Sequence, residues 1–356
     1  MKLSIQKMKD VKIEFRKPIY LFNPELIDYL EKNNRLTNIR FYYDDLLRFS
    51  DYTPVLDKEG KDTLWLSVYY PELEHDEIEA NLNKIYTLLH SDGDVEVLPF
   101  LKVDSIHFCT FGNSKPFRIR VRNILNDNYT NFYIKKADAS RIYGLELEEI
   151  LSPNRINFLL YKDTLIEEHI LGIPGDVFID QHLENCNPLE KAQIAKEFVK
   201  FNERCMIGLL GDMRSYNYVV IPAHDFDQVV YRIRAIDFDQ QCYEGNLKIY
   251  LPQYFKENIK MVELVQEKLK PNSIEQYKKE VRSAIAKRAS TDSRLEHLIA
   301  IMKKDTISKP ESVEELRTAL LKLTYNSQFK RCETMGEILE AGLNFVMRNY
   351  RNSNIR

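Results

Sequence analysis

The sequence predicts an α+β fold in which an antiparallel sheet precedes a mostly helical region. In residues 104–136, apolar and polar residues alternate in three runs joined by short turns, as in an antiparallel meander. Beyond Asp239, apolar residues recur at steps of three and four, as in helices. The 356 residues also exceed the roughly 250–300 at which a single core stops growing. We therefore expect an N-terminal accessory α+β region in 1–100, a sheet in 101–173 and a mostly helical region in 174–356.

The composition is that of an ordinary globular protein. Apolar residues make up 44% of the chain and charged residues 29%. The net charge of −3 gives no field that would indicate nucleic acid, so we expect no nucleic-acid partner. Residues 256–356 hold 20 Lys and Arg against 14 Asp and Glu. This local excess of positive charge favours either an acidic ligand or simply solvated helix faces.

Targeting signals are not recognisable in the sequence. The N-terminus is charged throughout, and no apolar run approaches the ~20 residues that a membrane span needs. The five cysteines are scattered without a CxxC spacing, which favours a reducing compartment over a disulfide framework. We expect a cytoplasmic protein that does not contact a membrane.

Residues 1–100 carry ordinary element signals and no recognisable chemistry. Asn23 followed by Pro24 is a typical helix start. Further elements are expected as a strand, a helix and a strand at 63–70, 78–89 and 95–101. This region is either an accessory domain or an extension of the sheet region.

Three successive strands are expected at the start of the sheet region, at 105–111, 116–123 and 128–136. The turn between the first two contains Gly112 and Ser114, and its backbone N–H groups could approach a phosphate. A plain hairpin turn would look the same.

Lys135 lies at the end of the third strand, and a helix at 138–151 follows it. That helix carries Glu146, Glu148 and Glu149. A lysine at a strand end can pair with a glutamate on the next helix, and such a lysine would bridge the α- and β-phosphates of ATP. The alternative is that all these charges face solvent.

Two further strands are expected at 154–161 and 164–173, and a helix at 188–210 follows them. Apolar residues at helical spacing predict that this helix packs in a core. We expect Gly211 to end it as a C-cap. Five more helices are expected after Asp239, at 251–269, 274–289, 293–304, 312–323 and 335–350.

The stretch from 211 to 240 holds the residues most suited to chemistry. Phosphoryl transfer needs a carboxylate that orients or deprotonates the acceptor hydroxyl, cations for the moving charge, and hard oxygen ligands for Mg²⁺. Asp212 would take the proton, Arg214 would approach the γ-phosphate, and Asn217 would bind the metal. Two strands connected by a turn would return Asp237 beside Asn217, so that both could bind one metal. Asp239 is either a second metal ligand or a cap of the next turn.

This stretch resembles the protein-kinase-like superfamily, whose catalytic loop reads D-x-K-x-x-N and whose metal-binding Asp follows a strand. It is most similar to the aminoglycoside phosphotransferase and choline kinase branch. There a Gly-Asp pair, an Asn five residues after the Asp, and an I-D-F-[DE] ending recur. Gly211-Asp212, Asn217 and the segment IDFD at 236–239 match this pattern. The resemblance covers about 105–243 and implies a bilobal fold, with a sheet-containing N-lobe and a mostly helical C-lobe.

The resemblance also implies roles for residues upstream. Lys135 would be the ATP lysine, with Glu146 as its partner and Glu149 as the next candidate, one helical step away. The segment LIEEHILGIPGDVF resembles the branch's hinge, which assigns Glu168 and Ile170 to the nucleotide. Gly112 and Ser114 would lie over its phosphates.

The sequence also departs from the family pattern. Leu210 stands where the family usually has a polar residue, and only Gly112 is present in the phosphate-covering turn. No long activation segment follows Asp237, which argues for a small-molecule or atypical acceptor over a protein.

We therefore expect an ATP- and Mg²⁺-dependent phosphotransferase that moves the γ-phosphate to a hydroxyl of an unidentified small-molecule or atypical acceptor. A pseudokinase that only binds nucleotide is the main alternative. Transfer of AMP in place of phosphate and a non-kinase binding protein of α+β fold are the others.

Overall fold

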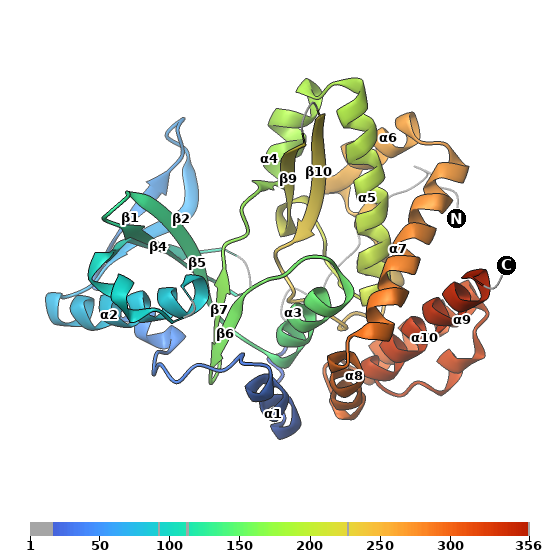
Figure 1. The fold of residues 1–356 in the computed structure, drawn as a ribbon, viewed down its shortest axis with the longest axis horizontal. Coiled ribbons are helices and arrows are strands. Elements are labelled where there is room, and N and C mark those ends of the chain that lie inside the picture. The colour runs from blue at the N-terminus through green and yellow to red at the C-terminus, as the bar shows by residue number, and fades with distance from the viewer. Residues whose placement is uncertain (1–16, 92, 112–113, 226–227, 355–356) are drawn as a thin grey trace.

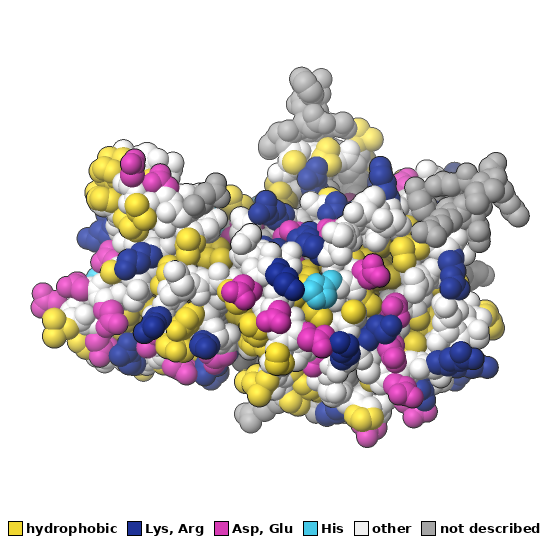
Figure 2. Space-filling model, turned by 60° about the horizontal axis from the view of Figure 1, so that its bottom comes forward, with side chains coloured by type: hydrophobic (Ala, Val, Ile, Leu, Met, Phe, Trp, Pro, Cys, Tyr) yellow, Lys and Arg dark blue, Asp and Glu magenta, His cyan; other side chains and the backbone are white. Residues whose placement is uncertain are grey.

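A computed structural model describes residues 17–354 except for 92, 112–113 and 226–227. The fold is α+β: a seven-stranded antiparallel sheet lies at one end of the molecule and most of the helices lie at the other (Figure 1). The expectation of an antiparallel sheet followed by helices is confirmed. Over the face shown in Figure 2, side chains of both charge signs are interspersed, in keeping with the small net charge of −3.

The seven-stranded sheet has the order β1-β2-β3-β4-β5-β7-β6. Its strands are β1 (Asp51–Leu56), β2 (Asp62–Tyr69), β3 (Leu101–Cys109), β4 (Phe117–Asn123), β5 (Asn128–Lys136), β6 (Phe158–Tyr161) and β7 (Thr164–Glu168). Side chains alternate across it: Phe117, Ile119 and Val121 of β4 are buried, while the arginines between them face the other side. Helix α2 (Glu72–His90) packs on the buried face with Ile78 and Leu82, among others.

The described part of residues 1–100 forms no separate unit. Strands β1 and β2 continue the same sheet as β3, and helix α1 (Pro24–Lys32) packs into the core of the helical region. The predicted strand at 95–101 is wrong, because Val95–Phe100 is a 3₁₀ helix that contains Pro99. Proline has no N–H to donate to a sheet, so β3 begins only after it.

Helix α3 (Ala139–Leu151) joins the sheet to the helical core. The Asp138 side chain caps its N-terminus by accepting from the backbone N–H of Arg141 at 3.0 Å. Almost every residue of α3 is buried, including Arg141 and Glu146. A helix buried on all sides must place its polar side chains against partners, and these partners shape the site described below.

The helical region contains α4 (Gly175–Val177), α5 (Pro188–Gly208), α6 (Ile259–Lys268), α7 (Pro271–Thr291), α8 (Arg294–Lys304), α9 (Pro310–Thr324) and α10 (Met335–Asn354). A small sheet of order β10-β9-β8 lies among them, made of β8 (Ile173–Pro174), β9 (Tyr218–Asp225) and β10 (Gln228–Ala235). Short 3₁₀ or π segments lie at Tyr43–Arg48, Phe178–His182, Leu183–Asn185, Ser215–Asn217, Leu247–Tyr250, Pro252–Tyr254, Lys256–Asn258 and Ser327–Arg331.

Helix α5 begins as its sequence indicates and ends earlier than expected. Asn187 caps it in a capping box with Glu190, and Pro188 occupies the first turn. The predicted C-cap at Gly211 is wrong: α5 ends at Gly208, and Leu209 takes the left-handed conformation with φ 52°. In the described part of the chain, no helix combines the length and apolar character needed to cross a bilayer.

Asn258, at the start of α6, ties the helical region to the loop that follows α5. Its side chain is fully buried and donates to the carbonyl oxygens of Met213 at 2.9 Å and Pro252 at 2.8 Å. Its Oδ1 accepts from the Tyr218 hydroxyl at 2.9 Å. The side chain therefore satisfies three polar groups that have no access to water.

Replacing Asn258 should destabilise the protein. The Asn258→Ala variant leaves buried polar groups unpaired, and we expect its free energy of unfolding to fall by about 2–4 kcal/mol. Urea unfolding monitored by circular dichroism measures this. Asn272→Ala, at an exposed position of α7, serves as the control and should lie within about 0.5 kcal/mol of wild type. Equal losses in the two variants would contradict the role of Asn258.

Candidate functional site

A cleft of about 720 Å³ lies between the seven-stranded sheet and the β8–β10 sheet. A volume of this size is typical of sites for small molecules and cofactors. The cleft is lined by nine of the residues singled out from the sequence, namely Ser114, Lys135, Glu168, Ile170, Asp212, Arg214, Asn217, Asp237 and Asp239. Glu146 does not line it, and Gly112 lies outside the described residues.

Gly211 is required where two loops meet. A Cβ atom at this position would lie 2.9 Å from the carbonyl oxygen of Gln240 and 3.0 Å from the Ile249 side chain. The N–H of Gly211 donates to that same Gln240 oxygen at 3.2 Å. The loop that carries Asp212 is thereby pressed against the segment that follows Asp237.

Asp212 lies in the left-handed region, with φ 58°. This conformation is unfavourable for a non-glycine residue and persists only when its surroundings impose it. The carbonyl oxygen of Asp212 accepts from the Arg214 N–H at 2.8 Å and from Asn217 Nδ2 at 2.7 Å. These bonds close the turn from Asp212 to Asn217.

The return of the chain to Asn217 occurs through the β9–β10 hairpin, as the sequence suggested. Tyr218 pairs with Ala235, and the N–H of Ile236 donates to the Asn217 carbonyl at 3.0 Å. Asp237 is the next residue, so the hairpin places it beside Asn217 although they are 20 positions apart.

The Asp212 carboxyl group is poised to exchange a proton near neutral pH. Burial raises its pKa to about 7, the Arg214 guanidinium opposes the shift, and the charges of Asp237 and Glu257 add to it. Arg214 donates from Nε to Asp212 Oδ1 at 2.9 Å and from Nη1 to Glu257 Oε1 at 2.7 Å. Arg214 is thus held between two carboxylates, and its immediate contacts are with these groups.

The expected partner of Lys135 is wrong. Lys135 Nζ lies 2.6 Å from Glu167 Oε2, and both side chains are buried. Glu167 stands opposite Tyr133 in the β5–β7 ladder, two positions from the Lys135 pair, so it shares the cleft-facing side of the sheet with Lys135. The helix α3 does not supply the partner.

Glu146 and Glu149 bind residues of the N-terminal part of the chain and of α8. Glu146 accepts from Arg35 at 2.6 Å and from the Tyr29 hydroxyl at 2.8 Å. Glu149 accepts from Arg35 at 2.6 Å and from Arg294 at 3.0 Å. Their helix face packs against α1 and α8, which is why neither glutamate reaches the cleft.

Arg141 is the charged residue with which α3 lines the cleft, next to Leu145 of the same helix. Its guanidinium lies 2.7 Å from Asp237 Oδ1 and 3.2 Å from Asp239 Oδ1, and only 2% of its side chain is exposed. Burial alone would raise the pKa of Asp237, but Arg141 and Lys135 outweigh it and hold that pKa below its ordinary value. Asp237 therefore stays ionised.

Lys17 is a second buried cation next to this group. Its Nζ lies 2.7 Å from Asp138 and 3.7 Å from Asp239 Oδ1, and it donates to the Asp239 backbone carbonyl at 2.6 Å. Asp239 thus lies between two cations, whereas the one cation in ion-pair distance of Asp237 among the described residues is Arg141.

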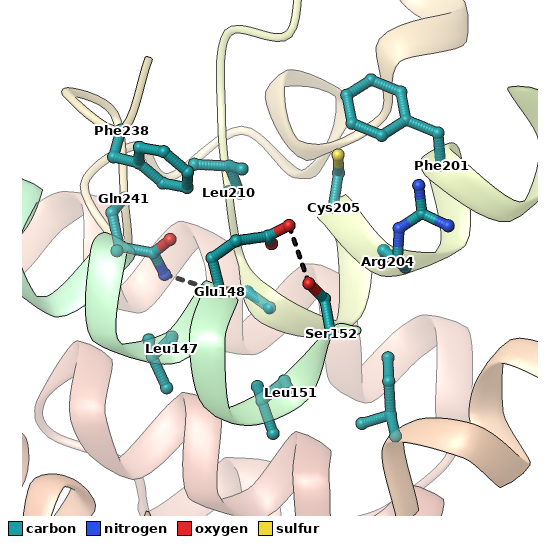
Figure 3. Close-up of a pocket in the computed structure, with 13 residues that line it drawn as sticks. Leu147, Glu148, Leu151, Ser152, Phe201, Arg204, Cys205, Leu210, Phe238 and Gln241 are labelled. Atoms are coloured by element: carbon teal, nitrogen blue, oxygen red, sulfur yellow. Dashed lines mark hydrogen bonds between the residues drawn. The ribbon is translucent and has the colours of Figure 1, made fainter. Parts of the chain in front are cut away.

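Figure 3 shows how tightly α3 lies against the loops. Phe238 and Gln241, from the segment after Asp237, border a cavity of about 30 Å³ between α3 and the end of α5 (Figure 3). Gln241 Nε2 donates to the Gly208 carbonyl at 2.6 Å. A Cβ atom at Gly144 would lie 2.9 Å from the Phe238 Cβ, so only glycine allows this approach of α3.

The oxygen atoms at the cleft fit a divalent cation that also has phosphate ligands. The described residues contain no cluster of three or more His, Cys, Asp or Glu side chains that could hold a metal ion. Asn217 Oδ1 and Asp237 Oδ2 are hard donors that accept no hydrogen bond within the described residues. Mg²⁺ typically takes one or two protein oxygens and completes its shell with phosphate and water. These two atoms fit that pattern.

Sequence patterns did not identify Arg141, Glu167 or Lys17 as site residues. Glu167 is adjacent to Glu168, and only the register of β7 against β5 determines which of them faces Lys135. Arg141 lies on a helix in which nearly every position is buried. The spacing of apolar residues in that helix therefore did not indicate which way the Arg141 side chain points. A charged residue inside such a helix is itself a signal, because it needs a partner.

The raised pKa of Asp212 predicts a pH dependence of stability in metal-free protein. The folded state binds this proton up to about pH 7, but the unfolded chain only to about pH 4. The folded state therefore holds more protons between these values, so this group lowers wild-type stability as the pH rises from about 4 to 7. Relative to wild type, Asp212→Asn should gain stability over that window and remain level above it.

Urea unfolding at a series of pH values in EDTA-containing buffer measures this difference. Asp28→Asn, at an exposed position of α1, is the matched control and should differ from wild type by a constant amount. A pH-independent difference for Asp212→Asn would contradict the assignment.

Comparison with known proteins finds no family model that matches the chain and no matching curated protein.

Proposed function

We propose that the protein is an ATP- and Mg²⁺-dependent phosphotransferase with a bilobal protein-kinase-like fold, closest to the aminoglycoside phosphotransferase and choline kinase branch. One observation carries the proposal. Lys135, the loop that carries Asp212 and Asn217, and Asp237 are three separate segments of the chain, and all four residues line one cleft of about 720 Å³. Each has the chemistry that its proposed role requires.

The nucleotide would lie under the seven-stranded sheet. Lys135, fixed by Glu167 at 2.6 Å, supplies the cation for the α- and β-phosphates. Glu168 and Ile170 lie at the connection between the two sheets. The backbone N–H of Ile170 has no hydrogen-bond partner within the described residues, so it is available to a base. Ser114 borders the same cleft.

Asp212 acts on the acceptor. The acceptor hydroxyl loses its proton to the Asp212 carboxylate, its oxygen forms a bond to the γ-phosphorus, and the bond from that phosphorus to the bridging oxygen of the β-phosphate breaks to release ADP. Arg214 orients the Asp212 carboxylate by its bond at 2.9 Å. Magnesium, when bound by Asn217 and Asp237, supplies positive charge to the phosphate oxygens.

The acceptor is a small or atypical molecule under this proposal. Only residues 238–246 separate Asp237 from the first short helical segment, Leu247–Tyr250, which is too short a stretch to be a long segment on which a peptide could lie.

A nucleotide-binding module without turnover is the second candidate. The observation that favours it is that Arg141 already forms ion pairs with both Asp237 and Asp239. A buried arginine in direct contact with a metal ligand competes with the metal for the same charge. The free Oδ2 of Asp237 keeps the catalytic proposal ahead, because one carboxylate can contact both cations.

Two substitutions separate catalysis from binding. We expect Asp212→Asn to lower kcat by about 10²–10⁴ because the proton acceptor is lost, while thermal stabilisation by ATP and Mg²⁺ persists. Asp237→Ala should lose both turnover and the Mg²⁺-dependent stabilisation. Asp28→Asn is the control and should match wild type in both measurements.

A metabolite extract supplies the candidate acceptors. The assay measures both ADP and pyrophosphate, to determine which of the two is released. Pyrophosphate in place of ADP would indicate AMP transfer. Unchanged turnover in Asp212→Asn would overturn the proposed base. Stabilisation by ATP and Mg²⁺ without turnover on any acceptor would favour the second candidate.

The Lys135–Glu167 pair provides a test that separates stability from nucleotide binding. Lys135→Met leaves Glu167 buried without its cation, so we expect a loss of about 3–5 kcal/mol in the free energy of unfolding. Adding Glu167→Gln should recover most of that stability, because neither residue then carries an uncompensated charge. Nucleotide affinity should remain low in both variants, since only the lysine contacts phosphate. Recovery of ATP affinity in the double variant, measured by calorimetry, would refute this role of Lys135.

A further inference from the structure

The cleft-facing side of the seven-stranded sheet extends beyond the cleft as a row of cations. Arg118, Arg120 and Arg122 alternate with the buried residues of β4 and so share one face. Lys102 stands opposite Arg122 in the β3–β4 ladder and therefore lies on the same face. The side opposite this face is the one that packs on α2.

Arg118 has no carboxylate partner within the described residues. Its Nη2 contacts His107 Nδ1 at 2.8 Å, and its guanidinium lies 4.7 Å from the Trp65 ring centroid. Burial, together with Arg118 and Arg120, lowers the pKa of His107 to about 4. His107 is therefore neutral near pH 7, and the positive charge of Arg118 is not compensated by its neighbours.

The other two arginines are only weakly neutralised. Arg120 lies 3.6 Å from Asp104, and Arg122 lies 3.7 Å from Asp127, a side chain that is 79% exposed. Solvent-exposed pairs at such distances contribute little. The Nε of Arg122 is buried and has no hydrogen-bond partner within the described residues. Four cations thus face two poorly engaged carboxylates.

Aromatic rings are interleaved with these cations. The Arg120 guanidinium lies 3.9 Å from the Tyr129 ring centroid, and Tyr129 is 45% exposed. Tyr133 stands opposite Arg118 in the β4–β5 ladder. Trp65 and Tyr133 also line the cleft, so the basic and aromatic face continues into it.

We propose that this face, defined by Lys102, Arg118, Arg120, Arg122, Trp65, Tyr129 and Tyr133, binds a single-stranded nucleic acid. Arginines spaced along a strand match a phosphate backbone, and aromatic rings and guanidinium planes on a sheet offer stacking surfaces for unpaired bases. An acidic peptide would match the charges, but it has no bases that could stack on the aromatic rings. The overall net charge of −3 does not reveal this local distribution. The proposal does not depend on phosphoryl transfer.

Fluorescence anisotropy of labelled 20-nucleotide poly(U) and poly(dT) tests the proposal over a range of salt concentrations. We expect binding that weakens with salt, as release of counterions requires. The triple variant Arg118→Gln, Arg120→Gln and Arg122→Gln should lose about tenfold or more in affinity and show a smaller salt slope, by about 2 if three phosphate contacts are lost. The control removes three cations elsewhere, with Arg48→Gln, Lys84→Gln and Lys279→Gln, and should bind as wild type does.

Tyr129→Ala separates the contribution of base stacking from that of charge. The substitution is at an exposed position and leaves every cation of the face in place. We expect it to weaken oligonucleotide binding and to leave binding of heparin, a polyanion without bases, unchanged. Circular dichroism verifies that each variant is folded. Equal loss in the control triple variant, no oligonucleotide binding at low salt, or an unaltered affinity in Tyr129→Ala would overturn the proposal. Tighter binding of poly-glutamate than of oligonucleotide would assign the face to an acidic protein instead.

Discussion

The buried guanidinium of Arg141 connects the two parts of this molecule. It comes from α3, which follows the sheet directly, and it contacts Asp237 and Asp239, which follow the β9–β10 hairpin. A buried charge that loses its partner is costly, so each side of the cleft holds the other in place. Lys17 and Asp138 extend this arrangement to the N-terminal part of the chain and to the cap of α3. The position of Asp237 is therefore set by electrostatics as much as by the backbone.

Close packing at small residues has the complementary effect. Gly144 allows α3 to approach Phe238, and Gly211 allows the Asp212 loop to approach Gln240. Both contacts involve the segment after Asp237, which is consequently held from two directions. Asn258 holds the loop from a third direction through the Met213 carbonyl. The strained conformation of Asp212 persists because all these contacts determine the path of the chain around it.

The cleft shows how burial gives two neighbouring carboxylates different properties. Burial raises the pKa of Asp212, and the guanidinium of Arg214 only partly opposes this shift. Asp237 is also buried, but Arg141 and Lys135 keep it ionised. The roles proposed for these two groups, proton acceptor and metal ligand, would require this difference, since one must take up a proton and the other must remain charged. Outside the cleft, Arg118 contacts the Trp65 ring and His107, and it pairs with no acid among the residues that the structure describes.

The sequence by itself determined most of the helices and strands and the two acidic motifs. Alternation in 116–123 and 128–136 predicted strands, helical spacing predicted the later helices, and the spacing of Asp212, Asn217 and Asp237 predicted that a hairpin would bring them together. These features depend on local periodicity and short connections, which a sequence displays directly. Only the tertiary structure decided the partners of the charged residues. Glu167 in place of Glu146 pairs with Lys135 because strand register fixes which side of β7 faces the cleft. Arg141 faces the acids, and Glu146 faces Arg35, because the packing of α3 on all sides sets its rotation. Register and helix rotation arise from contacts between residues distant in the chain, and no local pattern encodes them.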